Sequence, residues 1–308
     1  MTESLRARCA AVPHEASVAQ SDPSLGIRYA LFAMLCFAVQ DGVSKYLAAL
    51  YPVPFFVMLR YWVFAGFVLV LASRKPGGLR AAAQTQRPLL QIARGVLLVL
   101  QIVVFVEALD RLGLATTMAF FALYPLAITV LAIPILGETV GWRRMAAVGV
   151  GFLGVLVILR PGVGPWDPAL LLGLLPAIGL AGYSLMTRIA TQADGGSGPA
   201  VFYTGVAGAA AITLWGLGNW VPVAPWDWAW IALLALAAMT GHSCLIRAYD
   251  ATEAVRLQPF AYLQMVFGVL VGWTVFVEPV DPWAILGMAM IVGAGLYALW
   301  RERRAAAG

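Results

Sequence analysis

Long apolar runs separated by short polar segments fill the chain from about residue 29 to residue 300. A run of roughly 17–25 apolar residues is long enough to cross the hydrocarbon core of a bilayer as one helix. The pattern therefore predicts ten membrane-spanning helices, over residues 29–48, 53–73, 89–109, 114–135, 143–160, 169–190, 199–217, 227–248, 254–277 and 282–300. The connections between these runs are short and leave no room for a soluble domain.

Part of this pattern occurs twice, about 140 residues apart. The residues that coincide are Ala108 with Ala248, Asp110 with Asp250, Phe120 with Phe260, Leu123 with Leu263, Glu138 with Glu278, and Val140 with Val280. Each copy has an acidic residue at both ends of the same apolar run, which apolar composition alone does not produce. A shorter match pairs Gln40, Ser44 and Lys45 with Tyr183, Thr187 and Arg188.

The duplication predicts how the chain is divided. Residues 29–162 form one five-helix repeat and residues 163–302 form the second, with a tail at 1–28 and another at 303–308. Because five crossings is an odd number, the second repeat must enter the membrane inverted with respect to the first. We therefore expect an all-α membrane protein with ten transmembrane helices, arranged as two inverted five-helix repeats around a central cavity.

Composition supports the membrane assignment. Hydrophobic residues make up 62% of the chain, charged residues 11%, and the mean hydropathy is +0.85, whereas a soluble domain is roughly 25% charged. Cys36 and Cys244 lie within apolar runs and Cys9 lies in the tail. This pattern has neither a disulfide framework nor metal-ligand spacing, so we expect no metal and no cofactor.

The net charge of +5 reflects orientation in the bilayer rather than a nucleic-acid partner. If the N-terminus is cytoplasmic, most of the basic residues outside the runs face the cytoplasm, and the opposite side carries Lys45, Arg111 and Arg160. This asymmetry is typical of membrane proteins and predicts that both termini are cytoplasmic. Residues 1–28 have no apolar stretch near Met1, so they are predicted to be a retained tail rather than a signal peptide.

Several residues and short motifs together identify a family. They are Lys45, Arg60, Glu107-Ala-Leu-x5-Ala115, Leu123-Tyr-Pro125, Gly137-Glu138, the glycines at 149, 151 and 154, Ala248-Tyr-x5-Val255 and Glu278. With them the chain resembles the drug/metabolite transporter superfamily, and within it the EamA-type ten-helix permeases. The tryptophan- and tyrosine-rich composition is most similar to YddG-type amino acid exporters. One departure stands out, because Gln264-Met265 in the second copy replaces the Tyr-Pro of the first.

Polar side chains within the runs are the candidate substrate ligands, because a polar group inside a membrane is costly and is usually functional. The resemblance implies that helices one, three, four, six, eight and nine line the cavity. The predicted substrate-binding residues are Gln40, Ser44, Gln101, Phe120, Tyr124, Tyr183, His242, Ser243, Gln258 and Tyr262. For Gln40, Gln101 and Ser44 the alternative is a hydrogen bond between helices. His242 either lines the cavity, donates to a carbonyl or carries a proton.

A second group of residues is expected to have structural or gating roles: Asp41, Lys45, Arg60, Pro125, Glu138, Pro259 and Glu278. Asp41 and Lys45 are four residues apart on one helix and are expected to form an ion pair, as are Glu107 and Arg111. Arg60 is expected to bind carbonyls or a carboxylate and so hold helices together, with a substrate carboxylate as the alternative. The two glutamates are expected to fix turns at helix ends, and the prolines are expected to kink helices.

Together these features predict a secondary transporter. A cavity of Phe, Tyr, Gln and His suits a small amphipathic or zwitterionic solute, and no Walker A loop for ATP occurs. We expect export of amino acids, including aromatic and neutral ones, or of similar metabolites across the bacterial inner membrane by alternating access. Another metabolite (a nucleoside, a vitamin or a quaternary amine), moved in either direction, is the alternative.

An enzyme is not expected. The nearest nucleophile and base, His242 and Ser243, are adjacent on one helix and point about 100° apart, so they do not face each other. Beyond its substrate and the lipid bilayer no partner is expected, and the protein is expected to be a monomer, with a dimer left open.

Overall fold

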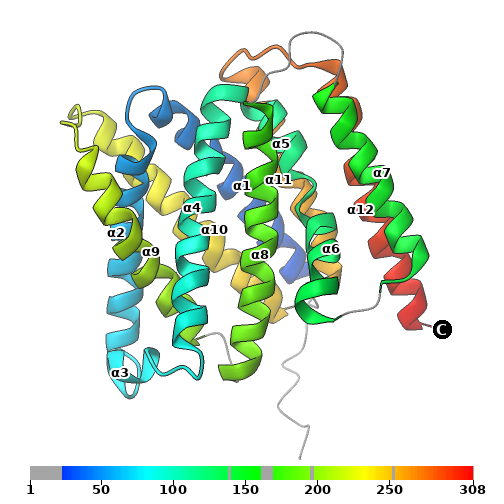
Figure 1. The fold of residues 1–308 in the computed structure, drawn as a ribbon. Coiled ribbons are helices and arrows are strands. Elements are labelled where there is room, and N and C mark those ends of the chain that lie inside the picture. The colour runs from blue at the N-terminus through cyan, green and yellow to red at the C-terminus, as the bar shows by residue number, and fades with distance from the viewer. Residues whose placement is uncertain (1–22, 138–139, 161–168, 195–197, 252–253, 308) are drawn as a thin grey trace, which may run out of the picture.

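The computed structural model describes residues 23–137, 140–160, 169–194, 198–251 and 254–307, and these residues form helices joined by short turns (Figure 1). The helices of the first half are α1 (Pro23–Ala48), α2 (Val53–Ser73), α3 (Gly78–Ala82), α4 (Pro88–Leu112), α5 (Leu114–Phe121), α6 (Tyr124–Leu136) and α7 (Trp142–Leu159). Those of the second half are α8 (Leu170–Asp194), α9 (Gly198–Gly218), α10 (Asp227–Ala251), α11 (Ala254–Thr274) and α12 (Pro282–Ala307). The prediction of an all-helical fold is confirmed.

The helices have the length and composition of membrane spans. Within the described residues, 7 segments are long and apolar enough to cross a bilayer, counting α5 and α6 together as the single span Leu114–Leu136. Shorter apolar helices over Met145–Leu159, Tyr262–Thr274 and Pro282–Ala298 correspond to the remaining predicted runs. Large apolar side chains such as Phe152 and Leu214 are exposed on the outside of the bundle, as expected where lipid surrounds the protein. The chain is a multi-pass membrane protein.

Helices from the two halves pack in matching pairs. α1 packs on α10 as α4 packs on α8, and α1 packs on α11 as α8 packs on α6. Figure 1 shows α2 beside α9 along one edge of the molecule and α7 beside α12 along the opposite edge. Exchanging the halves leaves this set of pairs unchanged, as a duplicated unit requires. The inverted relation of the repeats and their boundaries stay predictions.

A helix break interrupts the span predicted over residues 114–135. α5 ends at Phe121, and a new helix, α6, begins at Tyr124 with Pro125 in its first turn. Proline has no N–H to donate to the preceding turn, so it is tolerated at a helix start and breaks a helix interior. In the second half, where Gln264-Met265 replace the Tyr-Pro pair, α11 runs through without a break. The two copies thus differ in structure where they differ in sequence: the helix is broken at Tyr124-Pro125 and continuous at Gln264-Met265.

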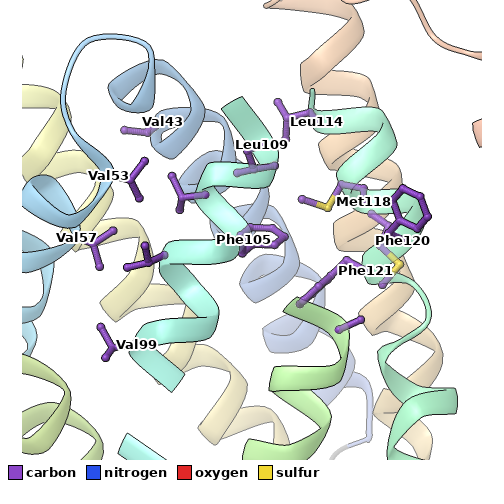
Figure 2. Packing of buried hydrophobic residues seen from close by; sticks show 14 of the residues in the cluster. Val43, Val53, Val57, Val99, Phe105, Leu109, Leu114, Met118, Phe120 and Phe121 are labelled. Atoms are coloured by element: carbon purple, nitrogen blue, oxygen red, sulfur yellow. The ribbon is translucent and has the colours of Figure 1, made fainter. Parts of the chain in front are cut away.

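The core lies between the helices of the first half and reaches into the second. Figure 2 shows buried valines that three helices contribute to this core, Val43 of α1, Val57 of α2 and Val99 of α4. Phe120 of α5 is fully buried and packs against Gly173 of α8, where any side chain would collide with its ring. Phe120 therefore belongs to the packed core in this conformation.

The contact between α7 and α12 depends on two facing glycines, which gives a first prediction. A Cβ atom added at Gly154 would lie 2.7 Å from the Gly287 carbonyl oxygen and 2.9 Å from Ile291 Cγ1. Gly154→Ala is expected to destabilise the protein by about 1–3 kcal/mol, because the two backbones must separate. Thermal unfolding in detergent measures this loss. The matched control is Gly149→Ala on the same helix, which meets nothing within 4 Å; equal melting temperatures for the two variants would contradict the prediction.

Candidate functional site

Asp41 stands at the centre of a buried hydrogen-bonded group. Its side chain is 1% exposed and lies about 10 Å from the end of α1, seven residues before Ala48. Oδ1 accepts from Gln40 Nε2 at 3.2 Å, and Oδ2 accepts from Gln264 Nε2 at 2.8 Å. Because Gln264 lies at the middle of α11, the second of these bonds joins the first half of the chain to the second half.

Arg60 of α2 completes this group. Its guanidinium donates from Nη2 to the Gln40 Oε1 atom at 3.1 Å, and the residue is 9% exposed. Arg60 was expected to bind carbonyls or a carboxylate, and it binds the carbonyl oxygen of a side-chain amide. We call Gln40, Asp41, Arg60 and Gln264 the polar centre.

The expected ion pair between Asp41 and Lys45 is wrong. Lys45 instead pairs with Glu278, in the turn after α11, and donates to the Leu109 carbonyl oxygen at 3.0 Å. Asp41 already has two amide donors, whereas Lys45 is near the end of α1, where its long side chain reaches the neighbouring turns. The expected pair between Glu107 and Arg111 is confirmed.

Glu278 also holds the start of α5. Its Oε2 atom accepts from the Leu114 N–H at 2.8 Å, and its own N–H donates to the Gly272 carbonyl at 3.0 Å. The expectation that Glu278 fixes a turn is confirmed, and Glu138, its counterpart in the first half, lies outside the described residues. We call Lys45, Leu109, Leu114 and Glu278 the Lys45 latch, because they tie α1, the α4–α5 turn and the end of α11 together.

A second buried cation, Arg94, joins α4, α8 and α9. It is 1% exposed and donates to Gln91 Oε1 at 2.6 Å, Thr187 Oγ1 at 2.9 Å and Thr204 Oγ1 at 2.8 Å, and also to the Ala200 carbonyl. Arg94 was not among the residues predicted to have a role, and its partners come from three different helices, which spacing along one helix does not reveal.

The Arg94 group extends to the end of α8. Gln91 Nε2 donates to Asp194 Oδ2 at 2.8 Å, and Asp194 also accepts from the Thr85 hydroxyl and the Gln86 N–H. An open hollow of about 520 Å³ lies here, lined by the α3–α4 turn, Asp194 and Tyr203. The hollow lies at helix ends on the surface, and no residue of the polar centre lines it. We therefore do not assign the substrate to it.

The remaining predicted substrate ligands are spread over several environments. Tyr183 lies 3.4 Å from Thr204 through its hydroxyl, Tyr124 stacks on Phe121, and Gln101 is buried beside Gly179. The buried hydroxyl of Tyr262 points toward Gly295 and has no hydrogen-bond partner among the described residues. The structure therefore brings only part of the predicted set to one place.

Of the remaining predicted ligands, Ser44 lies on the same helix as Gln40 and Asp41, and His242 lies on α10. The Ser44 hydroxyl donates to the backbone carbonyl of Gln40 at 2.8 Å, which is a bond within α1. His242 of α10 is exposed on one side and meets the Phe37 ring edge-on, with 5.0 Å between the centroids. Ser243 is half-buried, and the side chains of Gln258 and Pro259 are outside the described part of the structure.

A cluster outside the spans fixes the turn between α1 and α2 to the start of α10. The Tyr51 hydroxyl donates to Asp227 Oδ2 at 2.6 Å and accepts from the Ala224 N–H at 3.1 Å. The hydrogen bond to the Asp227 carboxylate raises the pKa of Tyr51 above its usual value. Tyr51 therefore stays protonated, and the contact stays intact, at neutral pH.

Among the described residues, no group of three or more His, Cys, Asp or Glu side chains is arranged to hold a metal ion. The polar centre offers a carboxylate, a guanidinium and two amides. Such groups bind a polar solute by hydrogen bonds and charge.

Known proteins resemble the chain over nearly its whole length. It is 25% identical to an S-adenosylmethionine uptake transporter of Rickettsia prowazekii, covering 91% of this chain and 94% of the relative. It is 29% identical to a riboflavin transporter of Vibrio cholerae (88% and 91% covered) and 25% identical to a pseudopaline exporter of Pseudomonas aeruginosa (87% and 94%).

A solved crystal structure matches the fold with a TM-score of 0.59 at 19% identity, covering 92% of this chain and 99% of the other. The model of the EamA-like transporter family matches the chain twice, over residues 24–160 and 167–300. These two matches lie in the two halves that the internal sequence similarity defines. The chain belongs to the EamA-like transporter family.

Proposed function

We propose that this protein is a secondary transporter that exports amino acids, or small metabolites of similar chemistry, across the bacterial inner membrane. The observation that carries the proposal is the polar centre. Asp41 and Arg60 are buried inside the bundle, and the bond from Gln264 to Asp41 connects the two halves of the chain. Ionisable groups inside a membrane are costly, and they usually mark the path of a substrate.

Alternating access requires that the halves move against each other around a site between them. The polar centre meets this requirement, because it is built from α1 and α2 of the first half and α11 of the second. The Lys45 latch supports the same scheme. It joins α1 to the turn after α11 at one face of the molecule, so its opening would free the halves there.

The second candidate is a carrier for a different metabolite, and the names of the relatives favour it. Those proteins are transporters of S-adenosylmethionine, of riboflavin and of pseudopaline, and they include both uptake and export. The solutes differ in size and charge, so membership of the family leaves the solute and the direction open. We keep amino acids as the first choice, because the polar centre offers one negative and one positive charge.

Transport by the purified protein in liposomes tests both candidates. The labelled panel is tryptophan, threonine, methionine, S-adenosylmethionine and riboflavin, supplied without ATP and with or without a pH gradient. Saturable uptake of at least one amino acid is the expected result. Uptake of riboflavin alone would favour the second candidate. Folded protein that transports no member of the panel would refute the amino-acid proposal.

A further inference from the structure

The side chain of Gln40 lies between two buried charges of opposite sign that it keeps apart. It donates to Asp41 Oδ1 at 3.2 Å and accepts from Arg60 Nη2 at 3.1 Å. Asp41 is 1% exposed and Arg60 is 9% exposed. One neutral amide therefore serves as a hydrogen-bond donor to a carboxylate and as an acceptor from a guanidinium.

An amide is a weak partner for these two groups. Hydrogen bonds in which both donor and acceptor are charged are shorter and stronger than those with one neutral partner, and a buried charge without a full counter-charge is unfavourable. The carboxylate of Asp41 would gain from a cationic donor, and the guanidinium of Arg60 would gain from an anionic acceptor. A ligand with both groups close together would satisfy both residues at once.

The amide of Gln40 indicates the geometry of such a ligand. Its nitrogen and oxygen share one carbon, so the donor and the acceptor lie side by side. In an α-amino acid the ammonium and carboxylate groups are both carried on the α-carbon, so a donor and an acceptor again lie close together. A phosphate ester has no donor for Asp41, and a simple amine has no acceptor for Arg60.

We propose that Asp41 and Arg60 bind the ammonium and the carboxylate of an α-amino-acid group, and that the Gln40 amide takes the place of this group in the empty carrier. Binding moves the amide aside and gives each charge a charged partner. The proposal rests on the proposed transport function and identifies its substrate class: a free amino acid, or a larger metabolite that carries an intact amino-acid group.

Gln264 connects the occupied site to the second half of the chain. It donates to Asp41 Oδ2 at 2.8 Å, so the carboxylate has one oxygen turned to Gln40 and the other to α11. An ammonium group at Asp41 therefore competes with Gln40 and leaves the bond to α11 in place. This arrangement allows the substrate to bind while both halves remain joined through the same carboxylate.

Ligands and variants changed in parallel test the proposal. Binding is measured on the purified full-length protein by thermal stabilisation, for L-methionine, S-adenosylmethionine, methionine methyl ester and N-acetylmethionine. Arg60→Gln is expected to weaken binding of methionine about 30-fold or more and to leave its methyl ester unaffected. Asp41→Asn is expected to do the same for methionine and to leave N-acetylmethionine unaffected. These pairings form a cycle in which each variant loses only the interaction that its paired ligand already lacks.

Further variants separate the proposal from a structural role. A role in folding alone would weaken all four ligands equally in both variants, and that result would overturn the proposal. Gln40→Ala is expected to strengthen methionine binding a few-fold, because the internal competitor is gone; loss of binding would show instead that Gln40 is a permanent ligand. Glu107→Gln, which breaks an exposed ion pair, is the control and should change nothing.

The outcomes also distinguish this inference from the proposed function. Transport of riboflavin together with no stabilisation by any amino-acid ligand would leave a carrier and overturn the inference. Stabilisation by methionine that follows the expected pairings, in a protein that transports nothing, would refute the transport function and support the binding site.

Discussion

Arg94→Met is expected to lower the melting temperature of the purified protein by roughly 10 °C and to reduce the amount of folded protein recovered. The substitution keeps an unbranched apolar stem but removes a buried cation that binds four groups on three helices. Breaking such a buried network costs about 3–5 kcal/mol, and 1 kcal/mol shifts the melting temperature by about 2–4 °C in a protein of 150–250 residues.

The orphaned groups explain why the cost is large. Without the guanidinium, the Gln91 amide oxygen loses its hydrogen-bond donor. Gln91, which donates to Asp194 through its amide nitrogen, is then no longer held in place. Arg111→Met is the matched control on the same helix, since Arg111 is exposed and its pair with Glu107 contributes about 1 kcal/mol or less. Similar melting temperatures for the two variants would show that the Arg94 network is not a structural anchor.

The helices could be predicted from the sequence because each reflects a property of its own residues. A long apolar run has few alternatives in a membrane, since every backbone polar group must be paired within the helix. The predicted runs therefore coincide with the apolar helices found. A kink was expected at Pro125, and the structure has a full break there, between α5 and α6, whereas α11 is continuous at Gln264-Met265.

The partners of the polar residues could not be predicted in the same way. Spacing along one helix suggested that Asp41 would pair with Lys45, but both residues bind groups from distant parts of the chain. Which distant groups meet depends on how the helices pack, and the apolar pattern does not encode this. Gln264 was noticed only as a departure from the motif of the first half, and that departure was the one signal for its role at Asp41.

The same limit applies to the aromatic candidates. In the sequence, Phe120 coincides with a residue of the second repeat, and Tyr262 is a polar residue within an apolar run. In the structure both pack tightly against glycines of neighbouring helices, Phe120 against Gly173 and Tyr262 against Gly295. A glycine opposite a ring lets two helices approach closely, and such a contact requires both helices to be placed. Residues at these contacts determine the packing of the helices more directly than they determine the choice of substrate.

Glu278→Gln is expected to open one face of the carrier and to reduce transport about tenfold or more. The glutamine can still accept from the Leu114 N–H, so the turn keeps its cap, and only the ion pair with Lys45 is lost. Both side chains of that pair are largely buried, at 14% and 15% exposure. Truncating one partner of such a pair costs about 2–5 kcal/mol, and each 1.4 kcal/mol changes a population ratio tenfold.

The opened state can be detected at Ser44, which is buried next to Lys45 on α1. With Ser44→Cys as the sole cysteine, a membrane-impermeant thiol reagent applied to the face that carries Lys45 should label the Glu278→Gln protein about tenfold faster than the protein with an intact latch. Glu107→Gln breaks the exposed pair near the same face and should leave labelling unchanged. Because a carrier must close each face in turn, faster labelling and slower transport should occur together. If transport falls while labelling stays the same, Glu278 acts through the turn at Leu114, and the Lys45 latch does not gate access.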